Sequence, residues 1–154
     1  MCLRASPVLA TGRGDRLEDV PQMPVLHAVL VNPGVPSPTG AVYRAYDAGP
    51  VGAADLDPGG ARWTADGLID WLSTTRNDLE APAMALAPAI AGVRDGLQAQ
   101  PGVGRVRMSG SGATVFALFH DADAADQAAR SVAQDQPHWW VRRTDLGKAA
   151  RLWP

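Results

Sequence analysis

The clearest hydrophobic pattern in the chain lies between residues 79 and 97. Apolar residues recur there at alternating intervals of four and three positions, which places them on one face of a helix: Leu79, Ala83, Leu86, Ile90, Val93 and Leu97. Asn77 precedes this run and Glu80 follows three residues later, as in a capping box. Pro88 lies inside the run and removes one backbone donor. The pattern therefore predicts one helix that bends at Pro88.

Shorter apolar segments predict β-strands on both sides of this helix. Val25 to Val31 is an apolar and partly β-branched run, and Asn32-Pro33-Gly34 should end it in a turn. Later in the chain, Arg105 to Met108 and Thr114 to Phe119 read as two strands. The five residues between them, Ser109-Gly110-Ser111-Gly112-Ala113, predict the turn of a hairpin.

Three further helices and a last strand complete the expected elements. Thr39 is placed to cap a short helix, whose apolar side is Ala41, Val42, Ala45 and Tyr46. A second short helix is expected from Asp66 to Leu72. The third follows Asp121 and has small apolar residues at helical spacing: Ala122, Ala125, Ala129 and Val132. Trp139 to Thr144 alternates like a final strand.

The order of these elements indicates an α+β fold. Strand, helices, strand, strand, helix and strand fit a ferredoxin-like split βαβ sandwich, in which helices cover one face of an antiparallel sheet. Residues 25–154 would form this domain. Residues 1–24 show no helical period and begin abruptly with a strand-like segment, so we interpret them as the truncated remnant of a preceding region. Residues 47–62 are rich in Gly, Pro, Asp and Ala, and predict a surface loop.

Composition narrows the possible functions. A chain of 154 residues with 46% hydrophobic side chains can form one domain with a substantial core. Its net charge of -2 and the lack of a dense Lys/Arg run argue against nucleic acid as a partner. Cys2 is the single cysteine, which excludes an intramolecular disulfide and fits a reducing cytoplasm. The sequence shows neither a membrane span nor the order of residues typical of a secretion signal.

Several polar and aromatic residues carry only weak functional signals. The histidines lack ligand spacing, so we assign no metal to them: His27, His120 and His138. The acidic candidates are better explained as turn and cap residues than as a general acid-base pair: Asp15, Asp78 and Glu80. In the pair Trp139-Trp140, one ring should pack on the core and the other should mark a contact surface.

The glycine-containing segment 109–113 has two interpretations. Glycines at 110 and 112 allow positive φ, and successive N-H groups there could face an anion. From the pattern alone, a simple hairpin turn is favoured over a phosphate cradle. No GK[ST] sequence follows the glycines, so the segment is not a P-loop.

The residues themselves add a family resemblance. The sequence from Met108 to Ala117, MSGSGATVFA, resembles the third conserved motif of the GHMP kinases. Two further segments, Val29 to Val35 followed by Thr39, and Asn77-Asp78-Leu79-Glu80 with its helix, are similar to one branch of that family. Members of that branch transfer the γ-phosphoryl group of ATP to the 2-hydroxyl of 4-diphosphocytidyl-2-C-methyl-D-erythritol, in non-mevalonate isoprenoid biosynthesis. The resemblance covers nearly the whole chain and is weakest in residues 47–62.

The resemblance also implies what this chain lacks. In the family, the main glycine-rich phosphate loop, an active-site Lys and the catalytic Asp belong to the N-terminal half, and none of them is recognisable here. ATP and Mg would be bound mainly by that missing half, which becomes the expected partner of this chain. The resemblance therefore assigns no catalytic residue to this chain and implies that the chain is inactive alone.

The resemblance assigns supporting roles to two segments. Ser109, Gly110, Ser111, Gly112 and Ala113 would lie beside the phosphate loop, where small residues permit close approach. Thr39 and Gly40 match positions near the substrate, and Tyr43 matches an aromatic position that stacks on the cytosine ring, where the family often has Phe. The residues alone leave alternatives open, because Thr39 could be only an N-cap and Tyr43 a half-buried core aromatic.

Two other functions fit parts of this pattern. The chain could be a free-standing ferredoxin-like module that binds a small ligand or a partner without catalysis. It could also belong to another GHMP kinase, such as homoserine kinase.

Overall fold

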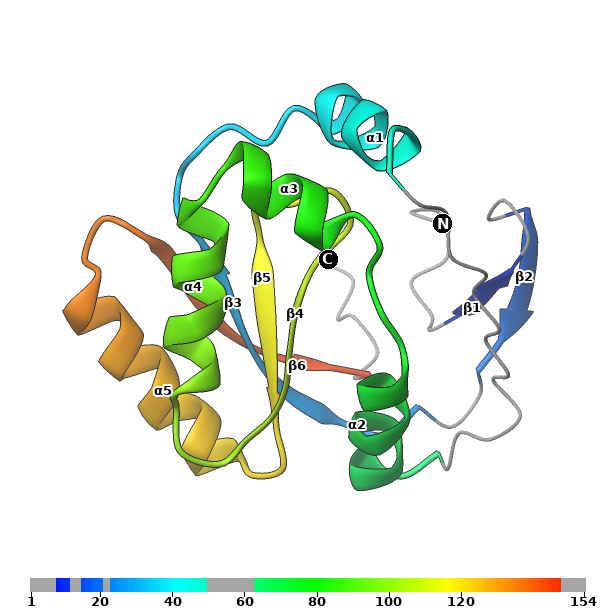
Figure 1. Cartoon of the computed structure of the whole chain (residues 1–154). Coiled ribbons are helices and arrows are strands. Elements are labelled where there is room, and N and C mark those ends of the chain that lie inside the picture. Colours follow the sequence, from blue (N-terminus) through cyan, green and yellow to red (C-terminus); the bar gives the residue numbers. More distant parts are fainter. Residues whose placement is uncertain (1–7, 12–14, 21–22, 50–62, 148–154) are drawn as a thin grey trace, which may run out of the picture.

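A four-stranded antiparallel sheet with two long helices on one face forms the body of the domain (Figure 1). The computed structural model describes residues 8–11, 15–20, 23–49 and 63–147. The strands occur in the order β4-β5-β3-β6, with the bounds β3 Leu26–Asn32, β4 Val103–Met108, β5 Val115–Phe119 and β6 Trp140–Leu146. Helix α4 (Ala89–Gln98) directly precedes β4 in the chain, and α5 (Ala122–Asp135) connects β5 with β6. This is the expected ferredoxin-like split βαβ arrangement.

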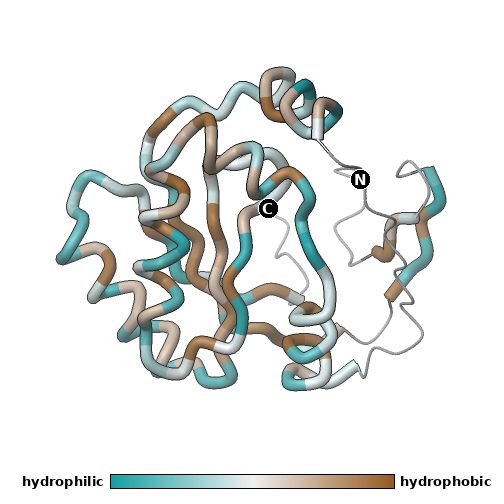
Figure 2. The backbone as a smooth tube through the Cα atoms, viewed as in Figure 1, coloured by the Kyte–Doolittle hydropathy of each residue, from teal (hydrophilic) through white to brown (hydrophobic). Residues whose placement is uncertain are grey.

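The main core lies between the sheet and helices α4 and α5. Alternate residues of the central strands face these helices, among them Val29, Val31, Val115 and Phe119, which are almost completely buried. They pack against the apolar face of α4 that the periodicity predicts, Ile90, Val93 and Leu97. Figure 2 shows that hydrophobic residues are concentrated along the central strands.

The expectation that helices cover only one face of the sheet needs a correction. Helix α2 (Ala65–Thr74) packs on the opposite face, where Leu68 and Ile69 form a second buried cluster with Leu26, Ala28 and Leu118. The neighbouring residues Val29 and Phe119 of the same strands belong to the main core on the other face. Both faces must therefore be covered to remove apolar surface from water.

The predicted single helix over residues 79–97 is wrong, because it is two helices. Helix α3 spans Glu80–Leu86 and α4 begins at Ala89. Between them, Ala87 adopts φ -137° and ψ 83°, and Pro88 takes the N-cap position of α4. A residue before proline avoids the helical region, and proline cannot donate the next hydrogen bond, so the helix ends instead of bending.

Helix α1 (Thr39–Asp47) begins at Thr39 itself, one residue earlier than it would if Thr39 were the N-cap. Pro38 occupies the N-cap position without a side-chain cap, and Thr39 is the first helical residue. The N-cap prediction for Thr39 is therefore wrong, which leaves its hydroxyl free for another contact. Val42 anchors the helix in the core.

Residues before the main domain form a separate small sheet. Strands β1 (Val8–Thr11) and β2 (Arg16–Asp19) pair with each other in antiparallel register. Cys2 and most of the predicted 47–62 loop, residues 50–62, lie outside the described residues. In the part of the chain that the structure describes, no helix has the length and apolar character needed to cross a membrane.

Candidate functional site

The turn between β4 and β5 has a defined conformation set by its two glycines. Gly110 has φ +55° and Gly112 has φ +87°, a region that side-chain-bearing residues rarely adopt. Two backbone hydrogen bonds close the turn. The Ser109 N-H donates to the Thr114 carbonyl at 2.9 Å, and the Gly112 N-H donates to the Ser109 carbonyl at 3.0 Å. We call residues 109–113 the glycine loop.

The two glycines differ in their surroundings. A Cβ atom at Gly112 would lie 2.9 Å from Met108 Sδ, 3.1 Å from Ile90 Cδ1 and 3.2 Å from Ser37 Oγ. A Cβ atom at Gly110 would meet no atom within 4 Å. Gly112 is therefore required by packing as well as by backbone conformation, whereas the space beside Gly110 is open to an approaching group.

Side chains from the segment between β3 and α1 hold one side of the glycine loop. Ser37 Oγ donates to the Ser111 carbonyl at 2.6 Å, and the hydroxyls of Thr39 and Ser111 lie 2.9 Å apart. At the base of the turn, Asn32 Nδ2 donates to Thr114 Oγ1 at 2.9 Å. The structure thus brings together two segments that the sequence resemblance assigns to the site, although they are 72 positions apart at Thr39 and Ser111.

The linker between α2 and α3 holds the other side of the glycine loop. Asn77 Nδ2 donates to the carbonyls of Met108, at 3.0 Å, and Gly110, at 2.8 Å. The Met108 N-H donates to Glu80 Oε2 at 3.1 Å. The predicted capping box is wrong, because α3 has Leu79 at its N-cap without a side-chain cap bond. The side chain of Glu80 accepts from Met108 and not from the Asn77 backbone, whereas that of Asn77 donates to the loop and accepts only the Leu79 N-H at the start of α3.

Sequence reasoning missed this role of Asn77 and Glu80, and that of Asn32 and Ser37. A signal was present for the first pair, since Asn77-Asp78-Leu79-Glu80 is one of the segments on which the family resemblance rests. The local spacing already explained Asn77 and Glu80 as cap residues. Their contacts with Met108, about thirty positions away in the sequence, were therefore not considered.

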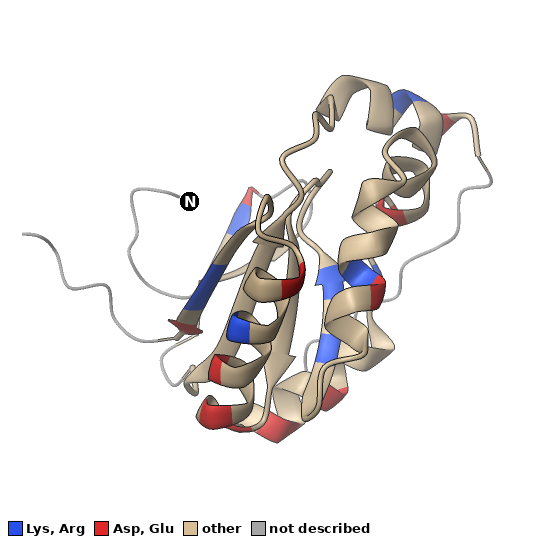
Figure 3. Ribbon diagram, turned by 90° about the vertical axis from the view of Figure 1, so that its left-hand side faces the viewer, with Lys and Arg blue, Asp and Glu red and all other residues tan. Residues whose placement is uncertain are grey.

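Two arginines of β4 fix the start of the same linker. Arg105 Nη2 donates to the carbonyl of buried Thr75 at 3.0 Å, and Arg107 donates to the Thr75 hydroxyl. The Arg107 guanidinium also lies over the Phe116 ring, 5.9 Å from its centre. Burial, followed by the charge of Arg105, lowers the pKa of Arg107. Figure 3 shows basic residues on both edge strands of the sheet, β4 and β6.

Gly40 and Tyr43, the other predicted substrate residues, lie on the exposed part of α1. Tyr43 follows Thr39 by one helical turn, and its side chain is 49% exposed. It packs against neither hydrophobic cluster, so the alternative of a core aromatic has no support. Gly40 is exposed as well. Contact of these residues with a substrate stays a prediction.

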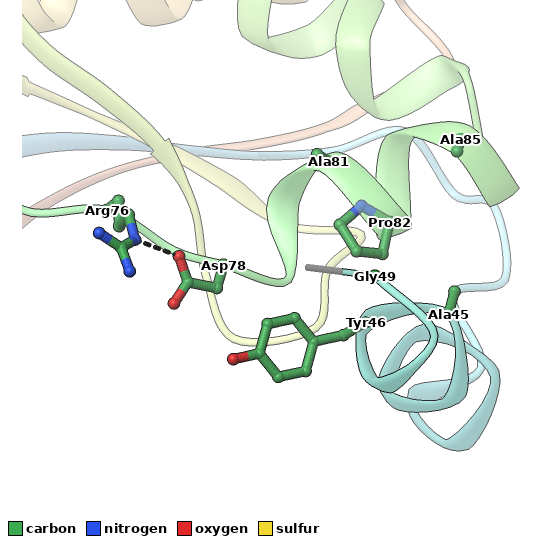
Figure 4. Close-up of a pocket in the computed structure, with 8 residues that line it drawn as sticks. All are labelled: Ala45, Tyr46, Gly49, Arg76, Asp78, Ala81, Pro82 and Ala85. Carbon is green, nitrogen blue, oxygen red and sulfur yellow. Dashed lines mark hydrogen bonds and ion pairs between the residues drawn. The ribbon is translucent and has the colours of Figure 1, made fainter. Parts of the chain in front are cut away.

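A pocket of about 570 Å³ lies between α1 and α3. Its walls are mostly small or apolar, and Figure 4 shows the Tyr46 ring projecting from α1 beside the ion pair of Arg76 with Asp78. The full lining comprises Ala45, Tyr46, Gly49, Arg76, Asp78, Ala81, Pro82 and Ala85. Hydrogen bonding and charge from Asp78 raise the pKa of Arg76. Asp78 thus pairs with a neighbouring arginine and does not act as a cap.

The remaining candidate residues make structural contacts. His27 Nδ1 lies 2.8 Å from Asp145 Oδ1, and His120 Nδ1 lies 2.6 Å from Asp66 Oδ1. Among residues 8–11, 15–20, 23–49 and 63–147, no group of three or more His, Cys, Asp or Glu is placed to hold a metal ion. Trp139 packs against the main core, whereas Trp140 is 50% exposed, as predicted for one ring of each kind.

Comparisons with known proteins agree with this geometry. Residues 66–138 match the family model described as GHMP kinases C terminal. A protein of Caulobacter vibrioides (strain NA1000 / CB15N), named 4-diphosphocytidyl-2-C-methyl-D-erythritol kinase, is 53% identical over 148 residues, which are 94% of this chain and 51% of that protein. The chain therefore spans about half the length of the curated relatives it matches.

Two solved structures are also similar. A crystal structure of 4-(cytidine 5'-diphospho)-2C-methyl-D-erythritol kinase has a TM-score of 0.64 and 32% identity, covering 88% of this chain and 48% of that one. Homoserine kinase from Cytophaga hutchinsonii has a TM-score of 0.55 at 18% identity, covering 90% of this chain and 47% of its own, and this likeness shows the fold alone. Residues 66–138 therefore match the C-terminal domain of the GHMP kinases, and the similarity to kinases of that family extends over nearly the whole chain.

Proposed function

We propose that this chain is the C-terminal half of a kinase that transfers the γ-phosphoryl group of ATP to the 2-hydroxyl of 4-diphosphocytidyl-2-C-methyl-D-erythritol. The observation that carries the proposal is the 53% identity, over 94% of the chain, with a protein named for this reaction. Homoserine kinase is similar only at 18% identity, so it is the weaker choice of substrate class.

The geometry supports a division of labour within this half. The hydrogen bond between Thr39 and Ser111 places the start of α1 beside the glycine loop. Tyr43 would stack on the cytosine ring from α1, with Thr39 and Gly40 near the substrate. The glycine loop would lie beside the phosphate loop of the N-terminal half, and so near the phosphoryl groups, because Gly110 has open space beside it and small residues permit close approach. Phosphoryl transfer depends chiefly on such positioning and on charge stabilisation.

ATP and Mg belong mainly to the N-terminal half in this proposal. The described residues contain no carboxylate cluster that fits Mg, so we assign no step of the reaction to a metal ligand of this chain. The N-terminal kinase half is the expected partner, residues 1–24 belong to the connection with it, and residues 25–154 are the C-terminal domain. The cytoplasmic location expected from the single cysteine stays a prediction.

A chimera tests this function directly. The N-terminal half of the Caulobacter vibrioides relative would be joined to this chain, and phosphorylation of 4-diphosphocytidyl-2-C-methyl-D-erythritol would be measured with ATP. We expect activity from the chimera and none from the chain alone, with the intact relative as the positive control. Homoserine, offered to the same proteins, should not be phosphorylated.

Two results would overturn the proposal. A chimera that unfolds cooperatively, and so is folded, but never turns over ATP would favour a free-standing binding module. A chimera that prefers homoserine or another acceptor without cytidine would move the chain to a different GHMP kinase.

A further inference from the structure

The linker between α2 and α3, residues 75–79, contacts the pocket on one side and the glycine loop on the other. The side chains of Arg76 and Asp78 pair with each other beside the pocket (Figure 4). Asn77, between them, directs its amide to the glycine loop. Arg105 and Arg107 bind Thr75 at the start of the linker, and Glu80 binds Met108 at its end. The linker is thus fixed on both sides of Asn77.

The Asn77 amide fills three of its four hydrogen-bonding positions, including both donors. Both Nδ2 hydrogens have a backbone acceptor, the carbonyls of Met108 and Gly110, and Oδ1 accepts the Leu79 N-H at 3.1 Å. Met108 is the last residue of β4, which is an edge strand. With Glu80 accepting the Met108 N-H, the linker supplies at this point the partners that a neighbouring strand would supply.

The carbonyl of Gly110 determines where the next N-H points. In a planar trans peptide the C=O and the following N-H point in opposite directions. The Gly110-Ser111 bond is trans, since the described cis bond is Gly112-Ala113. A Gly110 carbonyl held toward Asn77 therefore turns the Ser111 N-H away from the linker. This N-H makes no hydrogen bond to any described residue.

We propose that Asn77 is a positioning residue that holds the Gly110 carbonyl and thereby aims the Ser111 N-H at the phosphoryl groups of the reaction. This inference rests on the proposed kinase function. The Ser37 hydroxyl fixes the other end of the same residue by donating to the Ser111 carbonyl. Asn77 and Ser37 together leave Ser111 little freedom to rotate, so its N-H is oriented before a phosphate arrives.

The substitution Asn77→Asp isolates this role. It preserves the shape of the side chain and the acceptor for Leu79, and it removes both donors to the loop. Gln100→Glu is the matched control, because Gln100 also donates a side-chain amide hydrogen to a backbone carbonyl, that of Gly96 at 3.1 Å, near the end of α4. Asn77→Ala provides a second variant without a new charge.

Hydrogen exchange on the chain alone tests the orientation. The Ser109 and Gly112 amides are hydrogen bonded within the loop and report its opening. We expect both Asn77 variants to speed their exchange about tenfold, as the loss of a hydrogen bond predicts, and Gln100→Glu to leave it unchanged. Exchange in both Asn77 variants equal to that of the unmodified chain would overturn the inference.

Kinetics of the chimera test the consequence for phosphoryl transfer. We expect Asn77→Asp to lower kcat about 100-fold and to leave the substrate KM within about twofold, because the misplaced group acts on the transferring phosphoryl and not on the cytidine end. A merely structural role would lower the melting temperature and leave kcat per folded molecule at the level of Gln100→Glu, which would overturn the inference. Failure of the proposed function is a separate result, because it shows as an inactive unmodified chimera.

Discussion

The glycine loop and helix α1 meet at one hydrogen bond but are held in different ways. The loop receives side chains from two distant segments, through Ser37 and Thr39 on one side and Asn77 on the other. Helix α1 is anchored by buried Val42, while Tyr43 and most of its other residues are exposed. This chain therefore determines the geometry of the loop internally, whereas the exposed side of α1 gains contacts only from a ligand or another protein part.

The difference has a consequence for substitutions. Changes in the loop should alter stability and catalysis together, because its conformation is part of the packed structure. Changes at Tyr43 should alter ligand binding without altering stability, because an exposed side chain contributes little to folding.

The largest expected effect is that of Gly112→Ala. The new methyl group meets Met108, Ile90 and Ser37 at 2.9 to 3.2 Å, in a backbone region that strains alanine. We expect the free energy of unfolding to fall by about 3 kcal/mol, from overpacking and backbone strain together. Denaturation by urea measures this. Gly110→Ala is the control, with a loss of only about 1 kcal/mol because it has strain without a clash. Equal losses at both positions would contradict the packing argument.

Tyr43→Ala should weaken substrate binding in the chimera by about 1 to 3 kcal/mol, the scale of one base-aromatic stack. Tyr43→Phe keeps the ring and should retain the affinity. Calorimetric titration with 4-diphosphocytidyl-2-C-methyl-D-erythritol measures both variants, and thermal unfolding should show no change in either. An unchanged affinity of Tyr43→Ala would remove Tyr43 from the substrate site and with it the proposed role of α1.

Glu80→Ala should cost about 1 to 2 kcal/mol of unfolding free energy, since it leaves the Met108 N-H without its acceptor. Asp95→Ala is a suitable comparison, because Asp95 is largely exposed and its ion pair with Arg94 should contribute less than about 0.5 kcal/mol. Chemical denaturation of the two variants distinguishes these values. A Glu80 variant as stable as the Asp95 variant would show that the linker does not secure the end of β4.

Thr39→Val should give the smallest effect, about 0.5 kcal/mol, because the hydroxyl bond to Ser111 is exposed. A double-mutant cycle with Ser111→Ala measures the coupling between α1 and the glycine loop. Once one hydroxyl of the pair has been removed, removing the other should cost almost no further unfolding free energy through this hydrogen bond. Fully additive losses would mean that the two hydroxyls do not interact in solution.

Much of the fold could be predicted from local pattern. The strand ending at Asn32, the hairpin around residues 109–113, the helix after Asp121 and the apolar face of α4 all follow from spacing and turn residues. The break at Pro88 was only partly predicted. Either a bend or a break can accommodate the backbone N-H that Pro88 lacks. The non-helical conformation of Ala87 decides in favour of the break.

The candidate site, too, could be predicted only in part from the sequence. The residue types of the glycine loop, and its likeness to a GHMP kinase motif, are present in the sequence. The structure adds the contacts of Thr39 with Ser111 and of Asn77 with Gly110, which no spacing rule contains. It also places α2 on the second face of the sheet, where Leu68 and Ile69 cover residues of β3 and β5.

The sequence by itself determined the order of the strands of the main sheet, the apolar face of α4 and the family resemblance, because these depend on periodicity and on residue identity at neighbouring positions. Tertiary structure alone decided the use of Asn77 and Glu80. Asn77 Oδ1 accepts the Leu79 N-H at the helix start, as local spacing allows, but the Asn77 donors and the Glu80 carboxylate meet backbone partners on β4 once the sheet has formed. A side-chain amide or carboxylate bonds to whichever unsatisfied group the packed structure brings within about 3 Å, and that neighbour is defined only by the fold.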